Sequence, residues 1–185
     1  KDLNKVNSYE STIGELDVYS IYDDLKGHMW IGTLRHGLFK INLDDGSVDN
    51  YTNTESENSI PNNTIRAIVM DSKEKLWLAT DKGICSFDYK KEIFTSYKKE
   101  PYDEKSLIND KTRSLLIDDS GIIFVGTYSG ISVFNPNSNF YYFKSRPYDI
   151  NGLSGDVING LYKDNDKTLW VGTNENGVNI INGEN

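Results

Sequence analysis

Cysteine, proline and long apolar runs are all scarce in this sequence. Its 185 residues include one cysteine and four prolines. Cys85 alone cannot form a disulfide within the chain, and a lone cysteine is usually a small core residue. No apolar run approaches the roughly 18 residues that suggest a membrane-spanning helix, and no signal peptide is recognisable. On these grounds alone, a cytoplasmic protein and a mature or excised extracytoplasmic piece fit equally.

Positive charge is also in short supply. The chain has 20 Lys and Arg against 28 Asp and Glu, which gives a formal net charge of -8. A nucleic-acid-binding protein usually carries a basic patch or stripe. The only lysine clusters, Lys90-Lys91 and Lys98-Lys99, are short and flanked by glutamate, as is typical of a solvated surface. The sequence therefore predicts no nucleic-acid partner, and its length and 37% hydrophobic content fit one domain over residues 1–185.

What the sequence does contain is one pattern that occurs four times. Each copy has an aromatic residue, an aliphatic residue, a small residue and a threonine, as in WIGT and WLAT. The aromatic residues are spaced by 47, 47 and 46 positions: Trp30, Trp77, Phe124 and Trp170. The small residues follow at the same spacing: Gly32, Ala79, Gly126 and Gly172. Such self-similarity indicates a repeat architecture.

Each repeat divides into four short apolar runs separated by turn residues. In the second repeat the runs are IRAIVMD, LWLAT, GICSFDY and IFTSYKK. They are rich in β-branched and aromatic residues and too short for helices, so we expect strands. The first run of each repeat also carries a small residue, as expected for an innermost strand where repeats pack closely: Ser20, Ala67, Ser114 and Gly160. A four-stranded repeat of this length is the signature of a β-propeller blade.

The sequence therefore predicts an all-β fold, a β-propeller of four repeats, each a four-stranded antiparallel blade. The approximate blade boundaries are 11–51, 58–98, 105–144 and 151–185. The last repeat has no fourth strand of its own, whereas residues 4–10 resemble one, since Val6 and Tyr9 align with Val48 and Tyr51. Either this N-terminal strand completes the last blade and closes a ring, or the chain is a segment of a larger propeller.

The repeat resembles the two-component regulator propeller family. The family motif is roughly LSNNxVxxIxxDxxGxLWIGTxxGGLxxF, and residues 59–87 and 152–181 follow it closely. Phe124 and Ala79 depart from it, because they replace a tryptophan and a glycine. The resemblance implies an extracytoplasmic, non-enzymatic sensor of a bacterial membrane-anchored receptor, with its output domain outside this sequence. It also implies a small-molecule ligand such as a carbohydrate, and contact with the membrane only through other parts of the full-length protein.

Candidate binding residues lie where the repeats differ, because variable loops on a constant scaffold usually carry binding. One set occupies equivalent positions in the first strand of each repeat and should point toward the central channel: Tyr19, Arg66, Arg113 and Asn159. A second set lies in the turns between the second and third strands: Arg35, His36, Tyr128 and Glu175. Two arginines at a channel mouth would suit a carboxylate of an acidic sugar or organic acid. The alternative is that they pair with acidic neighbours in the same loops: Asp110, Asp156 or Glu15.

Two other functions stay open. A propeller lyase or glycosidase would need converging acid and base groups, for which His36, Glu175 and Asp81 are candidates from different repeats. A purely structural dimerisation module, which acts as a homodimer, is the third alternative. No metal site or cofactor is expected, because His28 and His36 should lie on opposite faces and no calcium-type loop is present.

Overall fold

The computed structural model describes residues 16–136, 140–146, 148–149, 151–164 and 167–182. Within these residues, fifteen strands form four antiparallel sheets and no helix is present. The predicted all-β class is confirmed, and each sheet corresponds to one repeat. No segment of the described chain is a helix long and apolar enough to cross a membrane. The expected strand at residues 4–10 lies outside the described residues.

Each sheet is termed a blade, numbered along the chain. Blade 1 contains β1 (Val18–Asp23), β2 (His28–Thr33), β3 (Leu38–Asn42) and β4 (Val48–Tyr51). Blade 2 contains β5 (Ile65–Met70), β6 (Leu76–Thr80), β7 (Gly83–Asp88) and β8 (Ile93–Tyr97). Blade 3 contains β9 (Thr112–Ile117), β10 (Ile123–Thr127), β11 (Gly130–Phe134) and β12 (Phe140–Phe143). Blade 4 contains three described strands, β13 (Ile158–Lys163), β14 (Thr168–Thr173) and β15 (Val178–Asn182).

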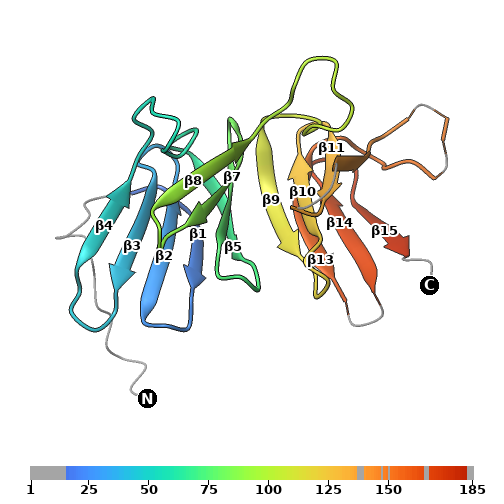
Figure 1. The fold of residues 1–185 in the computed structure, drawn as a ribbon. Coiled ribbons are helices and arrows are strands. Elements are labelled where there is room, and N and C mark those ends of the chain that lie inside the picture. The colour runs from blue at the N-terminus through green and yellow to red at the C-terminus, as the bar shows by residue number, and fades with distance from the viewer. Residues whose placement is uncertain (1–15, 137–139, 147, 150, 165–166, 183–185) are drawn as a thin grey trace.

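The blades stack side by side through their first strands, as Figure 1 shows from blue blade 1 to red blade 4. Contacts run from β1 to β5, from β5 to β9 and from β9 to β13. The apolar core accordingly divides into three clusters, one in each joint between consecutive blades. Trp30 of blade 1, for example, is fully buried against Ile65 and Ile68 of blade 2. The faces of blades 1 and 4 that point away from the stack keep large apolar side chains exposed.

The small residue two positions after the aromatic allows neighbouring blades to approach closely. A Cβ atom on Gly32 would lie 2.8 Å from the carbonyl oxygen of Ile65 in the next blade. A Cβ atom on Gly126 would lie 2.8 Å from the side chain of Ile158. The threonine that follows has a separate role, because its hydroxyl donates to the carbonyl oxygen of the glycine that ends the same turn. That bond is 2.7–2.9 Å long in all four blades.

An aspartate in the first turn of each blade links that turn to the aromatic residue of the second strand. One carboxylate oxygen, Oδ1, accepts the backbone N–H four residues later, at 3.0 Å in all four blades. The other, Oδ2, accepts the indole Nε1–H of the tryptophan in three blades: Asp24 from Trp30, Asp71 from Trp77 and Asp164 from Trp170. The tryptophan is therefore both a packing residue and a hydrogen-bond donor.

Blade 3 keeps the aspartate but has no indole donor, because Phe124 replaces the tryptophan. Here Oδ2 of Asp118 accepts from the ammonium of Lys163, which belongs to the next blade, at 2.7 Å. The same ammonium lies 5.9 Å from the centre of the Phe124 ring. A donor from across the joint thus occupies the position that the missing indole leaves open.

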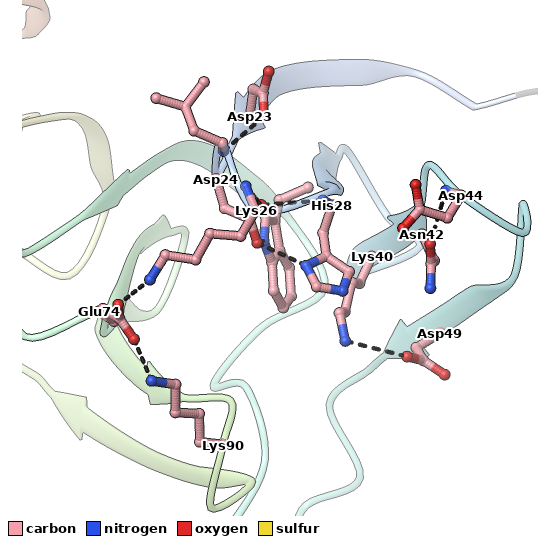
Figure 2. A network of polar contacts seen from close by, with 12 residues as sticks. Asp23, Asp24, Lys26, His28, Lys40, Asn42, Asp44, Asp49, Glu74 and Lys90 are labelled. Carbon is pink, nitrogen blue, oxygen red and sulfur yellow. Dashed lines mark hydrogen bonds and ion pairs between the residues drawn. The ribbon is translucent and has the colours of Figure 1, made fainter.

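Blade 1 surrounds its aspartate with further polar contacts (Figure 2). Nδ1 of His28 lies 2.9 Å from Oδ2 of Asp24. In the neighbouring turn, Glu74 of blade 2 lies between Lys26 and Lys90 and forms an ion pair with each. These hydrogen-bonded lysines lower the pKa of Glu74 to about 2. His28, the first residue of β2, thus helps to hold the turn that precedes it, and an ion pair joins the turns of blades 1 and 2.

Acid should weaken the fold through the turn aspartates. Burial tends to raise the pKa of Asp24, but hydrogen bonds from Lys26, His28 and Trp30 outweigh it and leave the pKa below its ordinary value of 3.8. A carboxylate whose pKa is lower in the folded state stabilises the protein above its unfolded pKa, and this contribution is lost as the pH falls through the folded pKa. We expect the free energy of unfolding, measured by urea denaturation, to decrease as the pH is lowered below about 4.

Asp24→Asn should lower that free energy at pH 7 by about 1–3 kcal/mol, because buried hydrogen-bond donors lose a charged acceptor. The variant should also lose less stability than the unsubstituted chain between pH 5 and pH 3. An equally steep decline in both proteins would contradict this role of Asp24.

The bond across the joint between blades 3 and 4 can be tested by exchange of the donor. Lys163→Met should cost about 1–3 kcal/mol in urea denaturation, since the buried Asp118 carboxylate loses a charged partner. Adding Phe124→Trp to that variant should recover part of the loss, because the indole N–H can then donate to Asp118 as it does in the other blades. Lys26→Met is the matched control: it breaks an exposed ion pair, worth about 0–1 kcal/mol. Failure of the tryptophan to rescue Lys163→Met would contradict the proposed equivalence.

Candidate functional site

The four first-strand candidates share one structural feature, a β-bulge. In every blade, the pairing between the first and second strands shifts register at the candidate position: Tyr19, Arg66, Arg113 and Asn159. A bulge leaves one residue out of the regular pairing and redirects its side chain, and bulges are common next to functional sites. The repeat therefore provides the same irregular position four times, and the sequence fills it with four different arrangements of charge and polarity.

In blades 2, 3 and 4, the bulge side chain meets the residue directly after the repeat threonine. The three pairs are Arg66 with Asp81, Arg113 with Tyr128, and Asn159 with Asn174. The partner lies 15 residues after the bulge residue in each case. The two residues come from the two sides of the same hairpin, so each blade presents one polar pair at the same end of its sheet. We term these three pairs, together with Tyr19, the bulge row.

Arg66 is neutralised within its own blade. Its Nε and Nη2 atoms donate to the two carboxylate oxygens of Asp81 at 2.8 and 3.2 Å. The hydrogen bond to Asp81 raises the pKa of Arg66 against the effect of burial. The Tyr19 ring of blade 1 covers the guanidinium, with its centre 4.9 Å from Cζ. The charge of Arg66 is therefore satisfied by a fork-like ion pair and an aromatic face.

The alternative that an acidic neighbour neutralises the arginines is confirmed for Arg66. The acids expected for this role were the wrong ones. Asp110 and Asp156 accept backbone N–H bonds from Lys99 and Ser145 and so fasten the connections between blades. Glu15 lies outside the described residues. The acid that pairs with Arg66 is Asp81, because the bulge turns the arginine toward the turn between β6 and β7 of its own blade.

Arg113 differs from Arg66, because its hydrogen-bond partner is neutral. Its Nη1 atom donates to the hydroxyl of Tyr128 at 2.6 Å, and its guanidinium lies 5.0 Å from the centre of the same ring. The ammonium of Lys111 lies 5.6 Å from that ring centre. Among the residues that the structure describes, no carboxylate lies within 4.0 Å of the guanidinium nitrogens of Arg113. Two cations therefore flank one phenol, and both retain the capacity to bind an anion.

The fourth pair carries no charge. Nδ2 of Asn159 donates to Oδ1 of Asn174 at 3.0 Å, and both side chains are exposed. Along the bulge row the character thus changes from a closed ion pair in blade 2, to an unneutralised cation in blade 3, to an amide pair in blade 4. Of the residues predicted for the first strands, Arg113 is the one with charge still available.

The remaining turn candidates do not converge. Arg35, His36 and Glu175 are all exposed, in the turns of blades 1 and 4. The backbone N–H of His36 donates to the Thr33 hydroxyl, and Glu175 accepts weakly from its neighbour Asn174 at 3.4 Å. Within the described part of the chain, no hydrogen bond or ion pair joins any two of these three side chains. Nor does this part contain a cluster of three His, Cys, Asp or Glu residues that could hold a metal ion.

A separate hollow of about 240 Å³ lies under the connection between blades 2 and 3. Tyr102 and Leu107 from the connection and Tyr142 from β12 contribute to its walls. None of the predicted site residues lines it, so it is a feature distinct from the bulge row.

Comparison with known proteins supports the repeat assignment. The sequence profile described as "Two component regulator propeller" matches residues 59–82 and 152–175. These two segments contain the first and second strands of blades 2 and 4. Among curated proteins, none matches the chain.

Solved structures share the fold at low sequence identity. One is an extracellular domain from B. thetaiotaomicron, described as part of a hybrid two-component system, with a TM-score of 0.54 and 17% identity. The match covers 89% of this chain and 27% of that one, so this chain spans about a quarter of that domain. A protein of unknown function from Bacteroides thetaiotaomicron has a TM-score of 0.62 at 7% identity, over 88% of this chain and 46% of that one.

The computationally designed protein Ika4 has a TM-score of 0.60 at 10% identity, and the match covers 91% of this chain and 92% of the designed one. At these identities, the structural likenesses show the fold alone. The sequence matches go further, because they fall on the repeat motif itself, twice and in the same register. Two segments of this chain, in blades 2 and 4, thus match the repeat of the two-component regulator propeller family.

Proposed function

We propose that this chain is a ligand-binding segment of an extracytoplasmic sensor in a bacterial two-component-type receptor. Its ligand is a small molecule that bears a carboxylate, such as an acidic sugar, and the signal passes to an output domain outside this sequence. Two observations support the sensor class: the family repeats, and the shared fold with an extracellular domain described as part of a hybrid two-component system. The proposed location on the outer side of the membrane follows from the same likeness.

The observation that carries the ligand class is the unneutralised guanidinium of Arg113. Tyr128 occupies Nη1 and orients the group, which leaves the other guanidinium donors available. A guanidinium binds a carboxylate through two parallel hydrogen bonds, which is the geometry that Arg66 already forms with Asp81 one blade earlier. Lys111 adds a second positive charge beside the same phenol. A carboxylate of the ligand would give Arg113 the charged partner that Asp81 gives Arg66 in blade 2.

Nothing in the described residues favours the enzymatic alternative over this function. The acid and base candidates His36, Glu175 and Asp81 stay on three different blades. The carboxylate of Asp81 is held by Arg66, so it is not available as a general base. We therefore propose a binding role without catalysis.

The test is a pair of ligands that differ only in the carboxylate, galacturonate and galactose, titrated by calorimetry. The unsubstituted chain should bind the uronate and show no measurable binding of the neutral sugar. Arg113→Ala should weaken uronate binding by about 10- to 100-fold, as expected for loss of a charged hydrogen-bond pair. Arg113→Lys should fall between the two, because an ammonium keeps the charge but cannot form the planar fork.

Arg66→Gln is the matched control, because it removes the other arginine of the bulge row, whose charge Asp81 already neutralises. Its affinity for the uronate should stay within about threefold of the unsubstituted chain, which is a difference of under 1 kcal/mol. An equal loss in both arginine variants would contradict the assignment to Arg113. Absence of binding to galacturonate and to simple organic acids such as citrate would contradict the carboxylate class.

A further inference from the structure

A cavity of about 320 Å³ lies in the joint between blades 2 and 3. We term it the joint cavity. It is lined by the turns that follow the first and the third strand of a blade, so it lies at the edge opposite the bulge row. Trp77 and Ser86 are buried at its inner end, with exposed fractions of 1 and 3%, whereas Lys73 and Pro136 are exposed at its mouth. Small-molecule sites have volumes of about 300–1,000 Å³, so the joint cavity is large enough for a ligand.

The preceding joint, between blades 1 and 2, shows which side chains can cover this position. There the ring of Tyr89 packs against the equivalent tryptophan, with 5.5 Å between the centres of the Tyr89 and Trp30 rings. The ammonium of Lys40 lies 5.8 Å from the centre of the same indole. In the adjoining turn, the carboxylate of Glu74 forms an ion pair with Lys26 (Figure 2). A ring, a long cationic side chain and a carboxylate thus complete that joint.

All three of these side chains are replaced by smaller ones in the joint between blades 2 and 3. The equivalent residues follow from the strand pairing and the repeat: Tyr89 corresponds to Pro136, Lys40 to Ser86 and Glu74 to Gly121. The three smaller residues all line the joint cavity. A Cβ atom added to Gly121 would meet no atom within 4 Å beyond its own chain neighbours, so a side chain has room there. The joint cavity is therefore the space where the preceding joint has a ring and a carboxylate.

The loss of the acid leaves a lysine without a counter-charge. Lys73 of blade 2 stands where Lys26 stands in blade 1, two residues after the turn aspartate. Within the described part of the chain, no carboxylate oxygen lies within 4.0 Å of the Lys73 or Lys75 ammonium, and both lysines line the cavity. Asp71 also lines it, but its two oxygens accept the backbone N–H groups of these lysines and the indole N–H of Trp77. The cavity therefore combines an aromatic wall with two available positive charges.

We propose that the joint cavity binds a small aromatic carboxylate. The ring of the ligand meets Trp77, as the Tyr89 ring meets its tryptophan one joint earlier, in the tilted contact that pairs of aromatic rings favour. The carboxylate of the ligand pairs with Lys73, as Glu74 pairs with the equivalent lysine. Ile123 of blade 3 adds an apolar wall. The ligand thereby bridges blades 2 and 3, at a site separate from the bulge row.

An NMR titration that follows the indole Nε1–H resonances of the three tryptophans tests the proposal with a local readout. The probe is 4-hydroxycinnamate, which carries a ring and a carboxylate at its two ends. We expect the Trp77 resonance to shift and saturate, whereas the resonances of Trp30 and Trp170, which do not line the cavity, should stay in place. 4-Hydroxycinnamide lacks the carboxylate and acetate lacks the ring, so each should bind more weakly by about tenfold or more.

Two substitutions that restore the side chains of the preceding joint should close the site. Gly121→Glu gives Lys73 an acid and Pro136→Tyr gives the indole a ring, so each should weaken binding of 4-hydroxycinnamate by about tenfold or more. The backbone at Gly121 suits a glutamate, since Glu74 has a φ of 64° at the equivalent position, against 80° for the glycine. Gly27→Glu is the matched control, because it places the same residue at the equivalent position of blade 1, outside the cavity, and should leave the affinity unchanged. Circular dichroism checks that each variant is folded.

The outcomes separate this site from the one proposed for Arg113. A Trp77 resonance that stays in place up to millimolar 4-hydroxycinnamate, or a Gly121→Glu variant that binds like the unsubstituted chain, would overturn the proposal. So would a shift of the Trp170 resonance as large as that of Trp77, which would indicate unspecific contact with aromatic side chains. A shift of the Arg113 Nε–H resonance alone would place the carboxylate in the bulge row, which contradicts a site in the joint cavity and leaves the proposed function intact.

Discussion

The bond from the turn aspartate to the aromatic layer is the constraint on which the rest of the structure depends. The carboxylate closes the turn between the first two strands and, in three blades, holds the indole of the second strand. In blades 1 and 2 that indole lies fully buried in the joint with the next blade. A single polar group thereby connects hairpin geometry to the packing between blades, which in turn aligns the first strands and their bulges.

Blade 3 shows how a repeat tolerates the loss of one partner. Phe124 keeps the aromatic packing but cannot donate a hydrogen bond, and the lysine that compensates comes from the following blade. The result is that the joint between blades 3 and 4 gains a charged bond, whereas the aspartates of blades 1 and 2 take their indole donor from within the blade. The missing indole of blade 3 is therefore replaced by a donor from blade 4, which couples these two blades.

The strands were predictable because the period of the repeat places apolar runs and turns in register four times. The bond between Asp24 and Trp30 was not predicted, because the spacing of six between the acid and the aromatic residue does not show which atoms of the two side chains meet. The partner of Arg66 was not predictable in the same way, because a bulge in the pairing turns the side chain toward Asp81 rather than toward Asp110 or Asp156. Trp30 is buried and Trp170 is partly exposed because the two residues lie at different positions in the stack of blades. The local motif is the same around both residues, so it does not predict this difference.

The repeat thus supplies a constant scaffold, and the bulge row supplies the chemistry that differs from blade to blade. We propose that Arg113 is the cation available to a ligand, whereas the charge of Arg66 is satisfied by Asp81. The most direct measurement is an NMR titration that follows the side-chain Nε–Hε resonances of the arginines as galacturonate is added. We expect the Arg113 resonance to shift and saturate while the Arg66 resonance stays in place. A shift of the Arg66 resonance alone, or of neither resonance, would show that Arg113 does not bind the carboxylate.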